Sequence, residues 1–193
     1  NPRSNVRILV VNWQDRLNPQ AGGAEVHLHA IFGRLAKAGH EVTLLVSGWE
    51  GAPAEGLIDG MRVFRRGGRY TFPLYVRRGF RAITEHAPPF DVLVEDINKL
   101  PLFTPYWAGI PVVGLVPHLF GSTAFQQERL PVAATVWAAE RLMPYAYRSC
   151  DFAVISDSTA SDLEGRGFSP ERIHVSYPGI DHQAFEPGPE PRE

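Results

Sequence analysis

Cysteine, an excess of either charge and long apolar runs are scarce or absent in this 193-residue sequence. The single cysteine, Cys150, excludes an intrachain disulfide and a cysteine zinc site, so we expect a cytoplasmic protein. A formal net charge of −2 gives no global signature of nucleic-acid binding, and we expect no nucleic-acid partner. No apolar run approaches the roughly 20 residues that cross a bilayer. Any membrane contact would therefore be peripheral, on the inner membrane face.

Two common nucleotide-binding motifs are also missing. No glycine-rich loop is followed by Gly-Lys-Ser or Gly-Lys-Thr, which excludes a P-loop. The glycine pair Gly22 and Gly23 lacks the three-glycine spacing of a dinucleotide fingerprint, and no ribose-binding carboxylate follows the apolar run that ends at Ser47. The sequence therefore disfavours both NAD and ATP chemistry, and we predict no cofactor.

Short apolar runs alternate with helix-like segments along the chain. This alternation is typical of a doubly wound, mostly parallel, Rossmann-like α/β sheet, here of about seven strands. The expected strands are residues 7–11, 42–46, 62–64, 92–94, 112–116, 152–155 and 173–176. The expected helices are residues 24–38, 132–147 and 158–166.

The chain changes character after Ser176. Four prolines and two glycines fall between Tyr177 and Pro191, a composition typical of a linker. We therefore predict one Rossmann-like domain over residues 1–176, followed by an interdomain exit segment over residues 177–193.

The first strand leads into a glycine turn that opens a helix. Gly22 and Gly23 have no side chains, so their backbone N–H groups can approach a ligand closely, and the positive end of the following helix favours an anion. A phosphorylated or nucleotide-linked ligand fits this geometry. A purely architectural strand-to-helix turn fits the two glycines equally well.

Four ordered segments together resemble family 4 retaining glycosyltransferases, which have the GT-B fold of two Rossmann-like domains. The segments are residues 18–25 after the first strand, residues 114–118, residues 153–156 before a helix, and residues 173–181 with Phe185. The resemblance extends over essentially the whole chain and implies that the chain is the N-terminal, acceptor-side domain. The family's donor-binding domain carries a Glu-x7-Glu motif, and no pair of glutamates here has that spacing.

The resemblance implies transfer of a sugar from a nucleotide-diphosphate donor to a glycan, a lipid-linked acceptor or a small molecule. It places Gly22 and Gly23 beside the donor diphosphate and sugar, and His118 beside the donor sugar as a catalytic residue. The chain has no Asp-x-Asp motif, so we predict no metal. Two alternatives are a GT-B sugar-nucleotide 2-epimerase and a stand-alone Rossmann-like binding module.

Several polar residues are predicted to lie on the acceptor side of the site. Glu95 and Asp96 end the fourth apolar run, where paired acids can act as a base and its electrostatic partner. The alternative for this pair is a solvated loop bridged to the nearby lysine. Glu25 can equally complement the helix N-terminus. The full acceptor-side set is Asp15, Glu25, Glu95, Asp96, Asn98 and Lys99.

Residues 59–86 contain seven arginines interleaved with aromatic and aliphatic side chains. Such a basic amphipathic segment suits anionic lipid headgroups or a phosphorylated lipid acceptor. Arg77, Arg78 and Arg81 are the residues predicted to form this surface. The alternative is the solvated face of an ordinary helix that covers the sheet.

Overall fold

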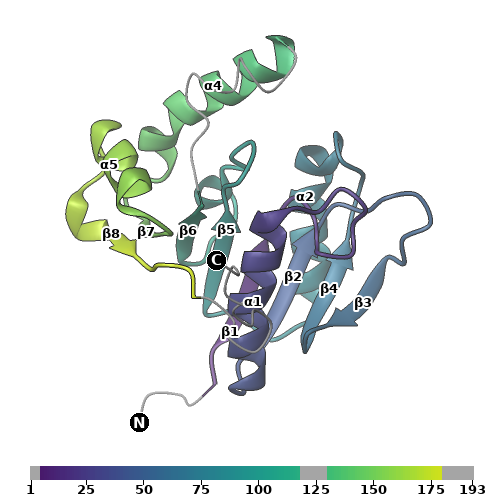
Figure 1. The fold of residues 1–193 in the computed structure, drawn as a ribbon. Coiled ribbons are helices and arrows are strands. Elements are labelled where there is room, and N and C mark those ends of the chain that lie inside the picture. Colours follow the sequence, from purple (N-terminus) through teal and green to yellow (C-terminus); the bar gives the residue numbers. More distant parts are fainter. Residues whose placement is uncertain (1–4, 118–129, 180–193) are drawn as a thin grey trace, which may run out of the picture.

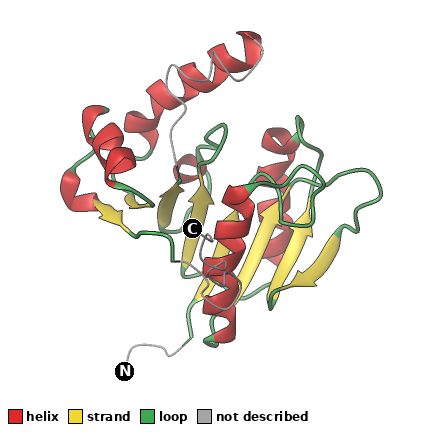
Figure 2. Cartoon of the chain, in the orientation of Figure 1, coloured by secondary structure: helices red, strands yellow, loops and turns green. Residues whose placement is uncertain are grey.

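The computed structural model describes residues 5–117 and 130–179. Within these residues eight strands form one sheet, in the spatial order 3-4-2-1-5-6-7-8 (Figures 1 and 2). The strands are β1 (Arg7–Val11), β2 (Glu41–Val46), β3 (Glu55–Ile58), β4 (Met61–Arg65), β5 (Val92–Asp96), β6 (Val112–Val116), β7 (Asp151–Val154) and β8 (Ile173–Val175). Every pairing is parallel except the one between β3 and β4. The predicted doubly wound, mostly parallel sheet is therefore confirmed.

The edge strand β3 is the element that the apolar pattern missed. Three of its four residues are exposed, so it has no buried alternation to reveal it. It pairs with β4 through a two-residue turn of Asp59 and Gly60, which have φ values of 53° and 82°. An Asp-Gly pair between two extended segments is a strong hairpin signal, and it was present in the sequence.

Helices cover both faces of the sheet (Figure 1). The three predicted helices are confirmed, with ends that differ by one or two residues. A further helix, α2, forms within the arginine-rich segment and has its buried side against the sheet. The helices of the described chain are α1 (Gly23–Lys37), α2 (Phe72–Glu85), α4 (Leu130–Ala146) and α5 (Asp157–Gly165), with short 3-10 turns η1 (Thr104–Tyr106) and η3 (Pro170–Arg172).

The two faces of the sheet have separate hydrophobic cores. Alternate residues of β1 point to opposite faces, so Val10 packs with Leu28 of α1 while Leu9 packs in the same core as Phe80 of α2. Because β1 is covered on both sides, its sequence is a continuous apolar run with no polar alternation.

The order of the strands creates a switch point between β1 and β5. From β1 the chain builds the sheet in one direction through β2 and β4, and then crosses to β5 and builds in the other. The loops after β1 and β5 therefore leave the same edge of the sheet in different directions, the arrangement in which doubly wound folds bind ligands. No helix in the described parts of the chain is both long and apolar enough to cross a membrane.

The packing makes a testable prediction at Gly114 in β6. A Cβ atom at this position would lie 2.7 Å from two ring carbons of the fully buried Phe152. We expect Gly114→Ala to lower the free energy of unfolding by about 1–3 kcal/mol, because the neighbouring ring cannot move freely in a packed core. Urea denaturation measures this change.

Gly165→Ala is the matched control for this substitution. A Cβ at Gly165, in the last turn of α5, would meet no atom within 4 Å. We expect this variant to match or slightly exceed the wild-type stability, because alanine restricts the unfolded chain. Equal stability of the two variants would contradict the packing described for β6.

Candidate functional site

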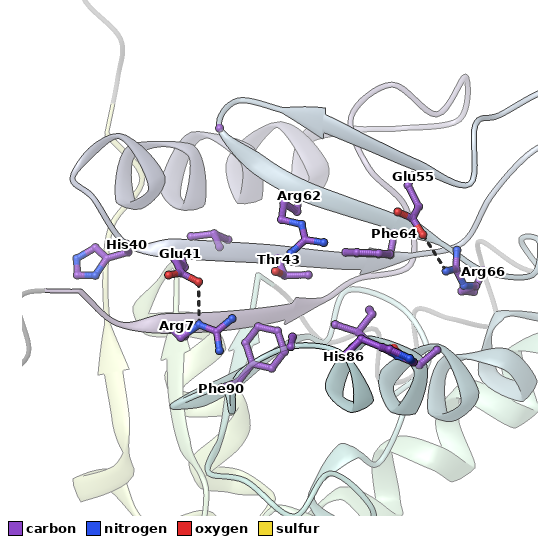
Figure 3. A pocket seen from close by; sticks show the side chains of 15 residues that line it. Arg7, His40, Glu41, Thr43, Glu55, Arg62, Phe64, Arg66, His86 and Phe90 are labelled. Carbon is purple, nitrogen blue, oxygen red and sulfur yellow. Dashed lines mark hydrogen bonds and ion pairs between the residues drawn. The ribbon is translucent and has the colours of Figure 1, made fainter.

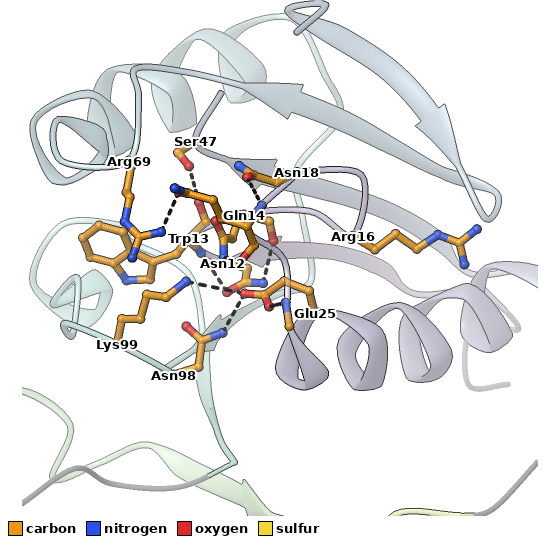
Figure 4. Close-up of polar contacts among 12 residues, drawn as sticks. Asn12, Trp13, Gln14, Arg16, Asn18, Glu25, Ser47, Arg69, Asn98 and Lys99 are labelled. Carbon is orange, nitrogen blue, oxygen red and sulfur yellow. Dashed lines mark hydrogen bonds and ion pairs between the residues drawn. The ribbon is translucent and has the colours of Figure 1, made fainter. Parts of the chain in front are cut away.

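The candidate site lies at the carboxyl edge of the sheet, where the switch point falls. The β1 loop (residues 12–22) and the β5 loop (residues 97–103) meet there beside the start of α1 (Figure 4). The first residues of the β1 loop are buried and hydrogen-bonded among themselves, with Asn12 bonded through its side chain to both Trp13 and Gln14. The loop is therefore a fixed part of the fold.

Gly22 is the N-cap residue of α1, and it has no side chain that could accept a hydrogen bond from the first turn of the helix. The first bond in the helical pattern runs from the Val26 N–H to the Gly22 carbonyl, so the earlier amides of the first turn have no partner within the helix. A Cβ at Gly23 would meet no atom of the described residues within 4 Å, and neither glycine has a positive φ. The chain itself therefore does not require glycine at Gly23, which leaves open space above the turn for a ligand.

Glu25 joins the glycine turn to the β5 loop. Its Oε2 accepts the Gly22 N–H at 2.7 Å, while its Oε1 accepts the Asn98 amide at 3.3 Å and lies 3.6 Å from the Lys99 ammonium. Glu25 thus complements the helix N-terminus, as one of the two sequence-based interpretations proposed. Because Glu25 occupies the Gly22 amide, the amides from Gly23 onward are the ones left for an anion.

Asp96 is buried at the end of β5 beside this carboxylate. Burial raises the pKa of Asp96 well above its usual value, and the negative charge of Glu25 raises it further, while Lys99 opposes the shift. Asp96 Oδ1 and Asn98 Oδ1 are both buried and accept no hydrogen bond from the described residues. Buried oxygens without a donor are uncommon, so these two are candidate acceptors for a ligand hydroxyl.

Two cationic side chains, Lys99 and Arg69, lie near Glu25 and Asp96. Burial lowers the pKa of Lys99, Glu25 opposes that shift, and the charge of Arg69 lowers the pKa further. Figure 4 shows Arg69 and Lys99 extending from different loops toward the centre of the site. Glu25, Asp96, Asn98 and Lys99 are called the polar cluster from here on.

Two of the predicted acceptor-side acids have internal roles instead. Glu95 is fully buried, and its carboxylate accepts hydrogen bonds from the Leu102 N–H, from the Thr104 N–H and hydroxyl, and from the Tyr147 hydroxyl. Burial raises the pKa of Glu95, and these bonds oppose the shift. This arrangement holds the β5 loop against the sheet and leaves the carboxylate no exposed surface for an acceptor.

Asp15 is likewise fully buried. Its Oδ2 lies 2.7 Å from Nε of Arg65, which is itself buried, and its Oδ1 accepts the Leu17 N–H. A buried carboxylate that has a matched guanidinium is a structural ion pair. Through these two contacts Asp15 fixes the β1 loop to Arg65 at the end of β4.

The remaining predicted residues lie elsewhere. Arg77, Arg78 and Arg81 are exposed on α2, away from the glycine turn. His118 lies outside the described residues, so its placement beside a donor sugar stays a prediction.

A hollow of about 530 Å³ adds residues that the sequence interpretation did not select. Gln20, Trp49 and Arg69 line it, each from a loop that follows the carboxyl end of a strand. Their position in these loops could have identified them from the sequence, because ligand contacts in doubly wound folds come from the loops after the carboxyl ends of strands. We call it the carboxyl-edge hollow.

A second hollow, of about 510 Å³, lies along the sheet beside the end of α2 (Figure 3). It shares no lining residue with the first. Both acidic side chains that line it form ion pairs, Glu41 with Arg7 at 2.7 Å and Glu55 with Arg66 at 3.4 Å. Arg7 and Glu41 begin their strands, so this hollow reaches the edge opposite the glycine turn, and we do not assign the site to it.

The comparison with family models identifies the family to which this doubly wound domain belongs. The model of Glycosyltransferase Family 4 matches residues 21–184, so the chain belongs to this family. The resemblance drawn from the sequence motifs is thereby confirmed. A search of curated protein sequences found no significant match.

Solved structures show the same fold at low sequence identity. Anabaena Alr3699/HepE, solved in complex with UDP-glucose, superposes with a TM-score of 0.60 at 16% identity, over 95% of this chain and 46% of that one. The catalytic domain of starch synthase IV from Arabidopsis thaliana, bound to ADP and acarbose, superposes with a TM-score of 0.60 at 11% identity, over 97% of this chain and 54% of that one. The chain thus spans about half the length of these proteins.

The raised pKa of Asp96 predicts how stability depends on pH. A carboxyl whose pKa is raised by folding keeps its proton in the folded chain where the unfolded chain has already lost it, so stability falls as pH rises through that range. Asparagine does not titrate. We expect Asp96→Asn to melt at a higher temperature than the wild type at pH 7, with the difference closing below about pH 4, near the ordinary aspartate pKa.

Thermal melts from acid to neutral pH test this expectation. Asp162→Asn, an exposed position on α5, is the control and should track the wild type throughout. If Asp96→Asn shows no stabilisation at neutral pH, folding does not raise the pKa of Asp96.

Proposed function

We propose that this chain is the acceptor-side half of a retaining glycosyltransferase that transfers a sugar from a nucleotide-diphosphate donor to an acceptor. Membership of Glycosyltransferase Family 4 supports the reaction class. The similar structures were solved with UDP-glucose and with ADP, which supports a nucleotide-linked donor. A C-terminal donor-binding domain, reached through residues 177–193, would complete the site.

The glycine turn, whose N-cap residue has no side chain, is the observation that carries the proposal. Breaking the donor bond leaves negative charge on a departing diphosphate, and preorganised donors aimed at that charge lower the barrier. The amides from Gly23 onward, which have no partner within the first turn of α1, together with the positive pole of the helix, would supply such donors. Open space above Gly23 gives the diphosphate room to reach them.

The polar cluster would serve the acceptor. In this proposal the unpartnered oxygens of Asp96 and Asn98 accept hydrogen bonds from acceptor hydroxyl groups when the ligand closes the site. His118 contacts the donor sugar. Retention of configuration follows from attack on the same face as the leaving group, so no enzyme nucleophile is required.

Gly23→Val in the complete protein tests the role of the turn. A branched side chain would fill the space through which the diphosphate reaches the backbone, so we expect kcat/KM for the donor to fall about 10-fold to 100-fold. Release of nucleoside diphosphate from a panel of donors is the measurement. Gly165→Val is the control, since it also adds a side chain in open space but far from the site.

Each outcome of this experiment separates the candidate functions. Unchanged kinetics in a folded Gly23→Val variant would mean that the turn is only architectural. Formation of the 2-epimer of the donor sugar without transfer would identify an epimerase. Failure of the wild type to bind any donor would favour a stand-alone binding module.

We further propose that α2 attaches the protein to an anionic membrane surface. Arg77 and Arg78 follow Leu74 by three and four residues, and Arg81 follows them by four and three. All four side chains are exposed, with Leu74 at 79% of its full surface. The opposite side of α2 is buried against the sheet. An apolar residue within a basic stripe suits the interface of an anionic bilayer.

Simultaneous change of Arg77, Arg78 and Arg81 to Glu tests this attachment. We expect binding to phosphatidylglycerol vesicles to weaken about 100-fold or more, because each basic residue near such a surface contributes about 1 kcal/mol. Added salt should weaken the wild-type interaction as well. The paired change of Arg34 and Lys37 to Glu on α1 is the control, and binding that survives reversal of the α2 charges would exclude this surface.

A further inference from the structure

The carboxyl-edge hollow is built from three loops that lie beside the glycine turn. Its lining residues come from the β1 loop, from the β2 loop (residues 47–54) and from the β4 loop (residues 66–71). They are Asn18, Pro19, Gln20, Gly48, Trp49, Glu50, Gly67, Gly68 and Arg69. The hollow lies at the same edge of the sheet as the polar cluster, and the charge of Arg69 in its lining acts on Lys99 of that cluster.

The walls of the hollow are held together by the backbone. The Gly48 N–H donates to the Gly67 carbonyl at 3.0 Å, which joins the β2 loop to the β4 loop. Gly67 has a φ of +64°, and a Cβ there would lie 2.9 Å from the Tyr75 ring, so this position requires glycine. The hollow is therefore formed before any ligand binds.

Trp49 forms a fixed flat surface in this hollow. The guanidinium carbon of Arg65 lies 4.8 Å from the centre of the Trp49 ring, and Arg65 is itself held by Asp15 and by the Pro53 carbonyl. A chain of contacts thus runs from the buried β1 loop to the ring. The face of an indole ring that no cation covers attracts C–H groups of partial positive charge, such as those on one face of a pyranose.

Arg69 brings positive charge to the same hollow. Its exposed guanidinium donates to the Gln20 side chain and forms no ion pair with any described carboxylate. The positive charge of Arg69 repels that of Lys99 and lowers the Lys99 pKa. Glu50 is the one acidic side chain among the lining residues. Because Arg69 pairs with none of the described carboxylates, its guanidinium is the group in this hollow that is available to an anionic ligand.

From this geometry we infer that the carboxyl-edge hollow is the acceptor subsite for a sugar ring that carries a carboxylate or a phosphate. Trp49 stacks against the ring and Arg69 binds the charged group. Naming the sugar as the acceptor rests on the proposed glycosyl transfer, whereas binding of the sugar to this hollow does not depend on it.

Titration of the complete protein with glucuronic acid, glucose 6-phosphate and glucose tests the inference. We expect at least one of the two charged sugars to bind about tenfold more tightly than glucose, since a hydrogen bond to a charged group contributes more than a neutral one. Whichever charged sugar binds more tightly identifies the group as carboxylate or phosphate. Inorganic phosphate is titrated alongside.

Two variants separate the ring contact from the charge contact. Arg69→Gln should abolish the preference for the charged sugars and leave glucose binding unchanged. Trp49→Ala should weaken all three sugars about threefold to tenfold, and Trp49→Phe should retain part of the affinity. Arg34→Gln and Tyr106→Ala are matched controls, because both residues are exposed and neither lines the hollow.

Several results would overturn the subsite. These are a charge preference that survives Arg69→Gln, sugar binding unaffected by loss of Trp49 in a variant that melts like the wild type, and phosphate binding as tightly as the sugar phosphate. Nucleoside diphosphate release with water as acceptor, measured in parallel, reports on the donor site alone. Sugar binding without any donor cleavage would refute glycosyl transfer and keep the subsite. Donor cleavage without any sugar binding would keep glycosyl transfer and refute the subsite.

Discussion

The carboxylate of Glu25 is the contact on which the arrangement of this edge depends. It is almost completely buried, and it bonds at once to the backbone of the glycine turn and to Asn98 and Lys99 of the β5 loop. A buried carboxylate is stable only while its partners stay in place, so each loop fixes the other. Because the two loops belong to opposite halves of the sheet, this one side chain connects the two halves at the switch point.

Burial sorts the acids of this region into two kinds. Glu95 and Asp15 are saturated by hydrogen bonds from loops and from a guanidinium, and they hold those loops in position. Asp96 is similarly buried, but one of its oxygens accepts no hydrogen bond from the described residues, and it lies beside the negative charge of Glu25. The first kind stabilises the loops, whereas the second has an oxygen that could still accept a hydrogen bond at the proposed site. Trp49 depends on the first kind, because Asp15 holds the arginine on which its ring lies.

The local pattern of the sequence predicted most of the fold. Seven of the eight described strands follow from short apolar runs, and the helices α1, α4 and α5 follow from apolar residues at helical spacing and from their capping residues. Strand β3 was missed because its side chains are exposed and its partner β4, rather than a core, defines it. In the site, the sequence selected the turn at Gly22 and Gly23 and the residues of the polar cluster, and the structure brings them together because the loops after β1 and β5 leave the same edge of the sheet. Their roles toward a ligand stay a prediction.

The sequence by itself determined which segments are strands and helices, where the glycine turn opens α1, and which family the motifs resemble. Only the tertiary structure decided which acids are buried in ion pairs, that Trp49 lies on Arg65, and that Arg69 faces the same hollow. The physical reason is the distance along the chain. Secondary structure depends on residues a few positions apart, whereas Asp15 and Arg65 are 50 positions apart and Glu95 and Tyr147 are 52. Burial and partner choice exist only after the sheet brings such residues together.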